Sequence, residues 1–254
     1  MNYIRKIAEK EPLDTGYVEL WDFSSANWNQ DSRIEAVATV AGICYGKPPK
    51  DAKKLVERLW TESGGFPSSA FEFISDGRTP GIEGSLRNDS HLATYEDDPE
   101  ASEEDLAREH KTNIATFRLK VPIFVARQIM RHRLFSYQEL SRRYTDDKRV
   151  PLDFWPTKGG EGKMTAMALF QLAYTIEERI YRLLLDSNVR AELARAVLGT
   201  GLYTEFWMMG NQKAWANYFA LRLDQHTQKE HRKVAQAMRG LLEEHQPEFA
   251  IQLP

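Results

Sequence analysis

Residues 121–144 read VPIFVARQIMRHRLFSYQELSRRY, an apolar run followed by a dense polar stretch. The apolar run, residues 121–130, predicts a buried helix, with Pro122 suited to its first turn. Arginine side chains are permanent forked donors that suit phosphates and flat rings bearing carbonyl groups. The polar stretch, residues 131–144, therefore predicts part of a site for a phosphorylated planar ligand such as a nucleotide. The alternative is a salt-bridge network at a subunit interface.

Individual residues of this region suggest roles in such a site. Gln128 and Arg131 are three residues apart on the predicted helix, so we expect them to share a face. Glu139 cannot be buried unpaired among arginines, and we expect it to neutralise one of them or to orient a ligand. Ser141 lacks the Gly-x-Ser-x-Gly setting of a serine nucleophile, so serine catalysis is not favoured.

Length and charge limit the class of protein. The chain has 254 residues, enough for one large domain with a sizeable core. Its net charge of −3 offers no global basic field and argues against nucleic-acid binding. No stretch approaches the roughly 20 apolar residues of a membrane span, and residues 1–14 lack the apolar centre of a signal peptide. We therefore expect a cytoplasmic protein that binds neither nucleic acid nor membrane.

Cysteine and histidine spacing argue against metal and thiol chemistry. Cys44 is the one cysteine, which excludes disulfides within the chain and cysteine-based metal clusters. It lies in the apolar run 36–44, where we expect a buried small hydrophobe rather than a thiolate. His226 and His231 are five residues apart and do not share a helical face, so we expect no metal site.

Periodicity places the regular elements. Residues 17–21 and 113–120 alternate as strands do, and 202–207 could be extended. One apolar stripe runs along the longest helix and includes Leu169, Leu172, Ile176, Ile180 and Leu183. Residues 74–111 are turn-rich and acidic, and we expect them to be an insertion of loop character. The predicted helices span residues 50–60, 122–130, 166–185, 189–198, 211–224 and 227–242, with one more from Asp31 or Ser32 to Ala41.

Arg131-His132-Arg133, seven residues, and then Ser141 with Arg143-Tyr144 resembles the signature of the flavin-dependent thymidylate synthases. The preceding helix and residues 192–195 resemble the family as well, over roughly residues 16–238. The resemblance implies a single α+β domain spanning residues 1–254, with a mixed or antiparallel sheet flanked by helices. It also implies a homotetramer whose active sites draw residues from several chains.

The same resemblance implies a reaction. The family converts dUMP to dTMP, taking the carbon from methylenetetrahydrofolate and the hydride from FAD that NADPH has reduced. A flavin hydride removes the need for a cysteine nucleophile, because arginines can stabilise the negative charge that builds on the uracil carbonyls.

The resemblance also implies roles for individual residues. Arg222 should polarise the uracil, and Ser141 should lie near the reacting ring without becoming a covalent nucleophile. Lys213 stands where the family usually has arginine, so a point charge replaces a forked contact. The expected dUMP contacts are Gln128, Arg131, Glu139, Ser141, Arg143, Arg195 and Arg222. The expected FAD contacts are Ser69, Glu72, Arg131, His132, Arg133, Glu139, Asn211, Lys213, Asn217 and His226.

Some alternatives stay open on sequence alone. The N-terminal flavin contact could be Ser69 with Glu72, which we favour, or His91 with Glu96. The chain could instead be a nucleotide-binding regulator that kept the fold and lost the chemistry, as the Lys213 change would allow. A nucleic-acid binder that uses residues 131–149 is a third interpretation, disfavoured by the net charge.

Overall fold

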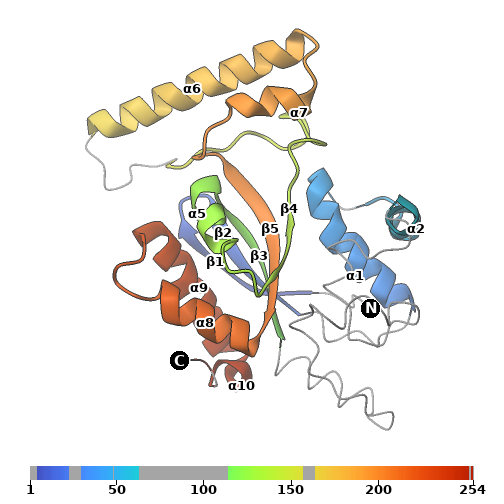
Figure 1. The fold of residues 1–254 in the computed structure, drawn as a ribbon, viewed down its shortest axis with the longest axis vertical. Coiled ribbons are helices and arrows are strands. Elements are labelled where there is room, and N and C mark those ends of the chain that lie inside the picture. Colours follow the sequence, from blue (N-terminus) through green and yellow to red (C-terminus); the bar gives the residue numbers. More distant parts are fainter. Residues whose placement is uncertain are drawn as a thin grey trace.

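A computed structural model describes residues 5–22, 30–47, 49–62, 114–156, 164–251 and 253. Within them, five strands form one sheet in the order β1-β2-β3-β5-β4, and every pairing is antiparallel (Figure 1). The expected α+β fold with an antiparallel sheet is therefore confirmed. The strands are β1 (Arg5–Leu13), β2 (Gly16–Asp22), β3 (Ile114–Pro122), β4 (Ser136–Glu139) and β5 (Tyr203–Asn211).

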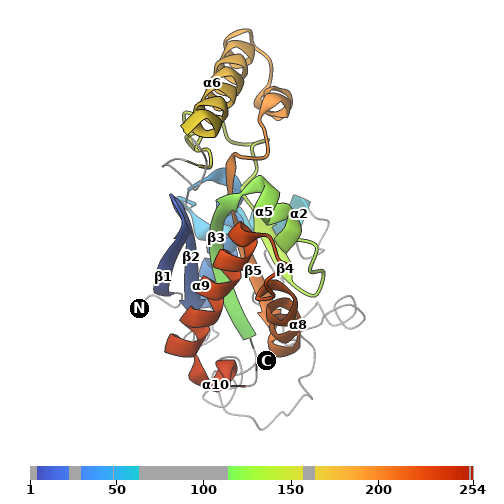
Figure 2. The same ribbon diagram turned by 90° about the vertical axis from the view of Figure 1, so that its left-hand side faces the viewer.

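Helices cover the two faces of the sheet unequally. One face packs against α5 (Ile123–Ile129), α8 (Gln212–Arg222), α9 (Lys229–His245) and α10 (Pro247–Ala250), and Figure 2 shows α8 and α9 in front of the strands. The other face receives α1 (Gln30–Gly42), which is followed by the short turn η1 (Ile43–Tyr45) and by α2 (Ala52–Glu62). At one end of the sheet stand α6 (Met164–Asp186), α7 (Ala191–Ala194) and η2 (Arg195–Val197).

Strand periodicity builds two cores from one sheet. Successive side chains of a strand point to opposite faces, so neighbours in sequence enter different cores. Phe206 and Met208 of β5 pack toward α8 and α9 with Phe117 of β3. Trp207 and Met209 of the same strand pack toward α1 instead. The sheet is therefore buried on both faces around β5, which fixes the position and direction of that strand.

Most predicted elements are present, and two predictions of detail are wrong. Asp31 and Ser32 lie inside the first turn of α1, which already begins at Gln30, and do not precede it. The helix before the polar stretch ends at Ile129, so Arg131 lies in the following turn and shares no helical face with Gln128. The hydroxyl of Tyr137 donates to the carbonyls of Ile129, at 3.0 Å, and of His132, at 2.9 Å, and these bonds hold the chain in a turn at that point.

The apolar stripe of α6 faces solvent in the single chain. Leu169, Leu172, Ile176, Ile180 and Leu183 are 62%, 57%, 49%, 42% and 56% exposed. An exposed apolar face of this length is typical of a surface used for interaction. No helix among the described residues is both long and apolar enough to cross a bilayer.

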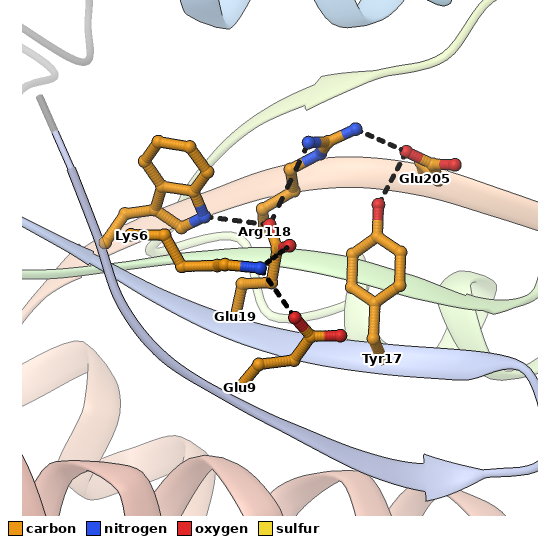
Figure 3. A network of polar contacts seen from close by, with 7 residues as sticks. Lys6, Glu9, Tyr17, Glu19, Arg118 and Glu205 are labelled. Atoms are coloured by element: carbon orange, nitrogen blue, oxygen red, sulfur yellow. Dashed lines mark hydrogen bonds and ion pairs between the residues drawn. The ribbon is translucent and has the colours of Figure 1, made fainter.

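A charged network lies on the same face of the sheet as α1 (Figure 3). Arg118 of β3 lies between two carboxylates, with its terminal nitrogens 2.7 Å from Glu205 and 3.8 Å from Glu19. Tyr17 donates to the same oxygen of Glu205 at 2.7 Å, and burial raises the pKa of its hydroxyl. Lys6 reaches Glu19 from β1 at 3.2 Å. The network therefore ties β1, β2, β3 and β5 together by charge.

Replacement of Arg118 by methionine tests how much this network contributes to the stability of the fold. Arg118→Met keeps the apolar stem but leaves the buried Glu19 carboxylate short of a cation, so the free energy of unfolding should fall by about 2–3 kcal/mol. Urea unfolding followed by circular dichroism measures the change. Lys10→Ala is the matched control, because Lys10 on β1 forms an exposed pair with Glu244 and should change stability by less than about 0.5 kcal/mol. Equal effects of the two variants would show that the network contributes nothing beyond surface charge.

Candidate functional site

Two predicted residues that are far apart in sequence meet at the end of α8. Arg222 is the last residue of α8, and its Nε donates to Nε2 of His132 at 2.7 Å. Because Nε2 accepts this bond, His132 is neutral and carries its proton on Nδ1. Burial first, and then the charge of Arg222, lowers the pKa of His132 to about 4. The turn after α5 and the end of α8 are therefore joined by an arginine and a neutral imidazole.

A second set of contacts lies beneath this pair and reaches Gln128. The hydroxyl of Tyr218 lies 3.1 Å from Nε2 of the fully buried His231. Nδ1 of His231 lies 3.2 Å from Oε1 of Gln128, whose amide nitrogen donates to Gln228. The rings of Tyr218 and His132 meet edge to face, with 4.9 Å between the ring centroids. We call these residues, Gln128, His132, Tyr218, Arg222 and His231, the Arg222 centre.

A second centre forms around Glu192 at the start of α7. Nε of Arg143 lies 3.2 Å from one carboxylate oxygen of Glu192, and Arg190 lies 2.6 Å from the other. Nε of Arg195 donates to the backbone carbonyl of Glu192 at 3.1 Å. Oγ of Ser141 accepts from the backbone N–H of Arg143 at 3.2 Å. This group, the Glu192 centre, gathers three of the predicted dUMP contacts, Ser141, Arg143 and Arg195, on an exposed surface.

The two centres lie at opposite ends of β4. Ser136, the first residue of β4, pairs with Met209 close to the start of α8. The strand then runs toward α7, which stands at the other end of the sheet in Figure 1. One chain therefore carries two separate parts of the predicted nucleotide site, with Arg222 in one part and Arg195 in the other.

The carboxylate of Glu139, at the end of β4, is hydrogen-bonded to a hydroxyl rather than paired with an arginine. Its Oε1 accepts a hydrogen bond from the hydroxyl of Thr204 at 2.7 Å, and it forms no ion pair with an arginine of residues 131–144. Of its two expected roles, neutralisation of one of these arginines is not seen in the single chain, because β5 places a hydroxyl beside the carboxylate. Orientation of a ligand by Glu139 stays a prediction. Burial raises the pKa of Glu139, against the smaller opposing effects of the Thr204 bond and the charge of Arg127.

The predicted flavin contacts on the described residues are mostly exposed donors. Lys213 and Asn217 are four residues apart on α8, so they share its outer face. Arg131 and Arg133 are exposed in the turn after α5, and His226 is exposed in the turn after α8. Asn211 caps α8, since its side-chain oxygen accepts from the backbone N–H of Ala214 at 2.9 Å. This set of cations and amides fits the phosphates and ring carbonyls of a flavin dinucleotide.

Four further predicted residues cannot be placed. Ser69, Glu72, His91 and Glu96 lie outside the described residues, as does the acidic insertion at 74–111. Both alternatives for the N-terminal flavin contact therefore stay predictions, as does the extent of the single domain.

Cys44 touches the polar stretch, which the sequence analysis did not anticipate. The side-chain nitrogen of Gln138 lies 2.7 Å from Sγ, and Sγ donates to the carbonyl of Glu139 at 3.2 Å. Burial raises the pKa of the thiol, and this outweighs the Gln138 bond, which lowers it. Cys44 is half-buried rather than fully buried, and its environment favours the thiol over the thiolate.

Tyr218 and His231 are the two members of the Arg222 centre that sequence reasoning missed. The signal for His231 was its position in α9, where it continues the apolar spacing of Val234, Ala235 and Met238. A histidine at such a position needs partners inside the protein. No group of three or more metal-binding side chains is found in the part of the chain that the structure describes.

Several curated proteins similar to this chain are flavin-dependent thymidylate synthases. It is 38% identical over 131 residues to the flavin-dependent thymidylate synthase of Pseudothermotoga lettingae, covering 49% of this chain and 59% of that protein. It is 34% identical over 140 residues to that of Thermotoga neapolitana, with 53% and 63% coverage. It is 31% identical over 144 residues to that of Synechocystis, with 51% and 66% coverage. The chain thus matches less than two thirds of the length of these relatives.

A family model matches a larger part of the chain. The model described as thymidylate synthase complementing protein matches residues 106–248, more than half of the 254 residues. The matched region contains both the Arg222 centre and the Glu192 centre. The match and the relatives confirm the family resemblance found in the sequence, and the chain belongs to the family of the thymidylate synthase complementing protein.

Proposed function

We propose that this chain is a flavin-dependent thymidylate synthase that converts dUMP to dTMP. In this proposal methylenetetrahydrofolate donates the carbon, and FAD carries a hydride from NADPH. The observation that carries the proposal is the 2.7 Å bond between Arg222 and His132. It joins a residue of the family signature to the arginine expected at the uracil, across 90 positions of sequence.

Arg222 is suited to polarise the uracil. Its bond to His132 uses Nε alone, so its two terminal nitrogens can donate to a carbonyl oxygen of a ligand. A fixed guanidinium stabilises the negative charge that develops on that oxygen when the neighbouring ring carbon reacts. His132 holds the guanidinium as a neutral acceptor, so it fixes the direction of the side chain without neutralising its charge.

The Glu192 centre is suited to hold the nucleotide phosphate. Arg143 and Arg195 supply forked donors, and Ser141 supplies a hydroxyl beside them. Glu192 pairs with Arg143 and fixes its guanidinium, while Arg195 is anchored through a backbone carbonyl of the same residue. In this proposal Ser141 binds and orients dUMP and forms no covalent bond to it.

FAD is the cofactor of this proposal. When bound, it would supply the hydride that completes the methyl group. Lys213, Asn217 and His226 would hold it, together with Arg131, His132 and Arg133 of the turn after α5. Cys44 takes no part as a nucleophile in this proposal, because its surroundings favour the thiol.

A homotetramer with shared sites would unite the two centres. In one chain Arg222 and Arg195 lie near opposite ends of β4, so a complete site needs the Glu192 centre of another copy. The exposed apolar stripe of α6 adjoins α7 and supports an interface close to that centre. A cytoplasmic location, expected from the sequence, is part of the same proposal.

Lys213 motivates a second candidate, a nucleotide-binding regulator without turnover. A lysine donates as a point charge where a forked arginine contact is usual in the family. Such a regulator would bind dUMP but would form no dTMP, even with FAD, NADPH and methylenetetrahydrofolate added. The assay that follows therefore separates the two candidates.

Turnover of the purified chain tests the enzyme directly. With FAD, NADPH, methylenetetrahydrofolate and dUMP, we expect dTMP measurable by liquid chromatography. Arg222→Ala should lower kcat by about 100-fold or more, because it removes a donor at the developing charge. Arg149→Ala is the control, since Arg149 is an exposed arginine in the loop beyond the polar stretch. Absence of dTMP from the wild type, or normal turnover of Arg222→Ala, would contradict the proposal.

Replacement of Cys44 tests the absence of a thiol nucleophile. Cys44→Ser offers Gln138 an oxygen in place of sulfur, so the local contacts persist. We expect kcat to stay within about threefold of the wild type, whereas loss of a covalent nucleophile costs many orders of magnitude. A folded Cys44→Ser protein without turnover would restore a thiol mechanism.

Mixing two inactive variants tests whether sites are shared. Arg222→Ala damages one centre and Arg195→Ala the other. If each site draws the two centres from different chains, random reassembly of an equal mixture leaves about one quarter of the sites intact. Co-expression should therefore restore about a quarter of wild-type turnover. No restoration, with both variants present in one assembly, would show that each site comes from a single chain.

A further inference from the structure

His231 is a buried titratable group to which the proposed reaction gives no role. It is fully buried in α9, with one ring nitrogen toward Tyr218 at 3.1 Å and the other toward Gln128 at 3.2 Å. Burial first, and then the charge of Arg222, lowers its pKa to about 3. The ring is therefore neutral at ordinary pH, and one of its nitrogens donates while the other accepts.

The neighbours of His231 decide which nitrogen carries the proton. The amide nitrogen of Gln128 donates to Gln228, which leaves Oε1 of Gln128 toward Nδ1 of His231. An oxygen there requires a proton on Nδ1. Nε2 then accepts from the Tyr218 hydroxyl.

The opposite tautomer has poorer partners. With the proton on Nε2, the Tyr218 hydroxyl could no longer donate to the ring. Its other neighbour is the thioether sulfur of Met238, at 3.8 Å, which is a weak acceptor. The Gln128 and Gln228 carboxamides would both have to turn over as well. The Nδ1-protonated ring therefore satisfies every member of the group better.

We propose that His231 is a positioning residue that fixes the Gln128 carboxamide, so that its NH₂ group faces the nucleotide as a donor. The proposal rests on the proposed function and deepens it. One hydrogen of this NH₂ group goes to Gln228, and no acceptor for the second is found among the described residues. Gln128 would then select an oxygen acceptor on the nucleotide, whether of phosphate, sugar or ring.

Tyr218 links the contact between His231 and Gln128 to Arg222. Its hydroxyl holds His231, while its ring packs edge to face with that of His132, the acceptor of the Arg222 bond. Tyr218 is fully buried, so its position is set by the core between α8 and α9. The two donors that would face the ligand, Gln128 and Arg222, are thus both held through this one ring.

Two substitutions of His231 separate positioning from packing. In His231→Asn the amide nitrogen lies near the position of Nδ1, so the donor toward Gln128 is kept. In His231→Gln the amide group extends toward the position of Nε2, so the contact with Tyr218 is kept and the donor toward Gln128 is lost. Both remove the ring, and both should lower Tm by similar amounts.

The test measures dUMP binding to the FAD-loaded full chain by titration calorimetry. His231→Gln should raise the Kd for dUMP about fivefold to tenfold, which is the loss of roughly one oriented hydrogen bond. His231→Asn should raise it less than about twofold. Equal weakening in the two variants, or weakening that follows the loss in Tm, would overturn the positioning role.

A measurement on the wild type keeps the proposal testable if the variants do not fold. The protein is labelled with 15N-histidine, and the His231 resonances are identified by substituting the other five histidines one at a time. The 15N chemical shifts of the His231 ring should then show that Nδ1 carries a proton and Nε2 does not. A protonated Nε2 would overturn the positioning role even where dUMP binds. A wild-type chain with the expected tautomer that binds no dUMP would instead overturn the proposed function.

Discussion

β5 is paired along both edges, with β3 on one side and β4 on the other, and this double pairing decides where a site can form. The pairing with β4 fixes the polar stretch after α5 against the sheet. The same strand continues into α8, whose last residue is Arg222. Since both segments are anchored to β5, Arg222 and His132 approach each other from fixed positions rather than from mobile loops.

Neutral imidazoles give the Arg222 centre its electrostatic character. Burial first, and then the charge of Arg222, lowers the pKa of both His132 and His231, so both rings are neutral. Each neutral imidazole then has one nitrogen that donates and one that accepts. His132 orients Arg222, and His231 orients Gln128. A carboxylate in place of His132 would hold Arg222 equally well but would cancel the charge that the proposed chemistry needs. The arrangement keeps one cation oriented and unneutralised.

Periodicity and the signature predicted much of this protein. The long helix, the central strands and the order of the candidate residues could be read from the sequence, because each depends on local spacing. β4 could not, since four residues are too few to show alternation. The stripe on α6 was predicted as apolar, but periodicity does not say what covers it, and the single chain leaves it exposed.

The site itself was harder to predict than its members. The signature places Arg131, Ser141 and Arg143 within thirteen residues, yet β4 carries the latter two away from the Arg222 centre. In the sequence, His231 is recognisable only as a polar residue on the apolar stripe of a helix. Its partners, Tyr218 and Gln128, come from α8 and α5. Such contacts depend on how helices pack across the sheet, which no local pattern encodes.

The central claim is that two copies of this chain together bind one nucleotide beside a flavin. A crystal structure with FAD and dUMP bound tests this claim most directly. We predict that Arg222 of one protomer lies at the uracil and Arg195 of its partner at the phosphate of the same dUMP molecule. A dUMP molecule bound wholly by one chain, or bound away from both centres, would contradict it.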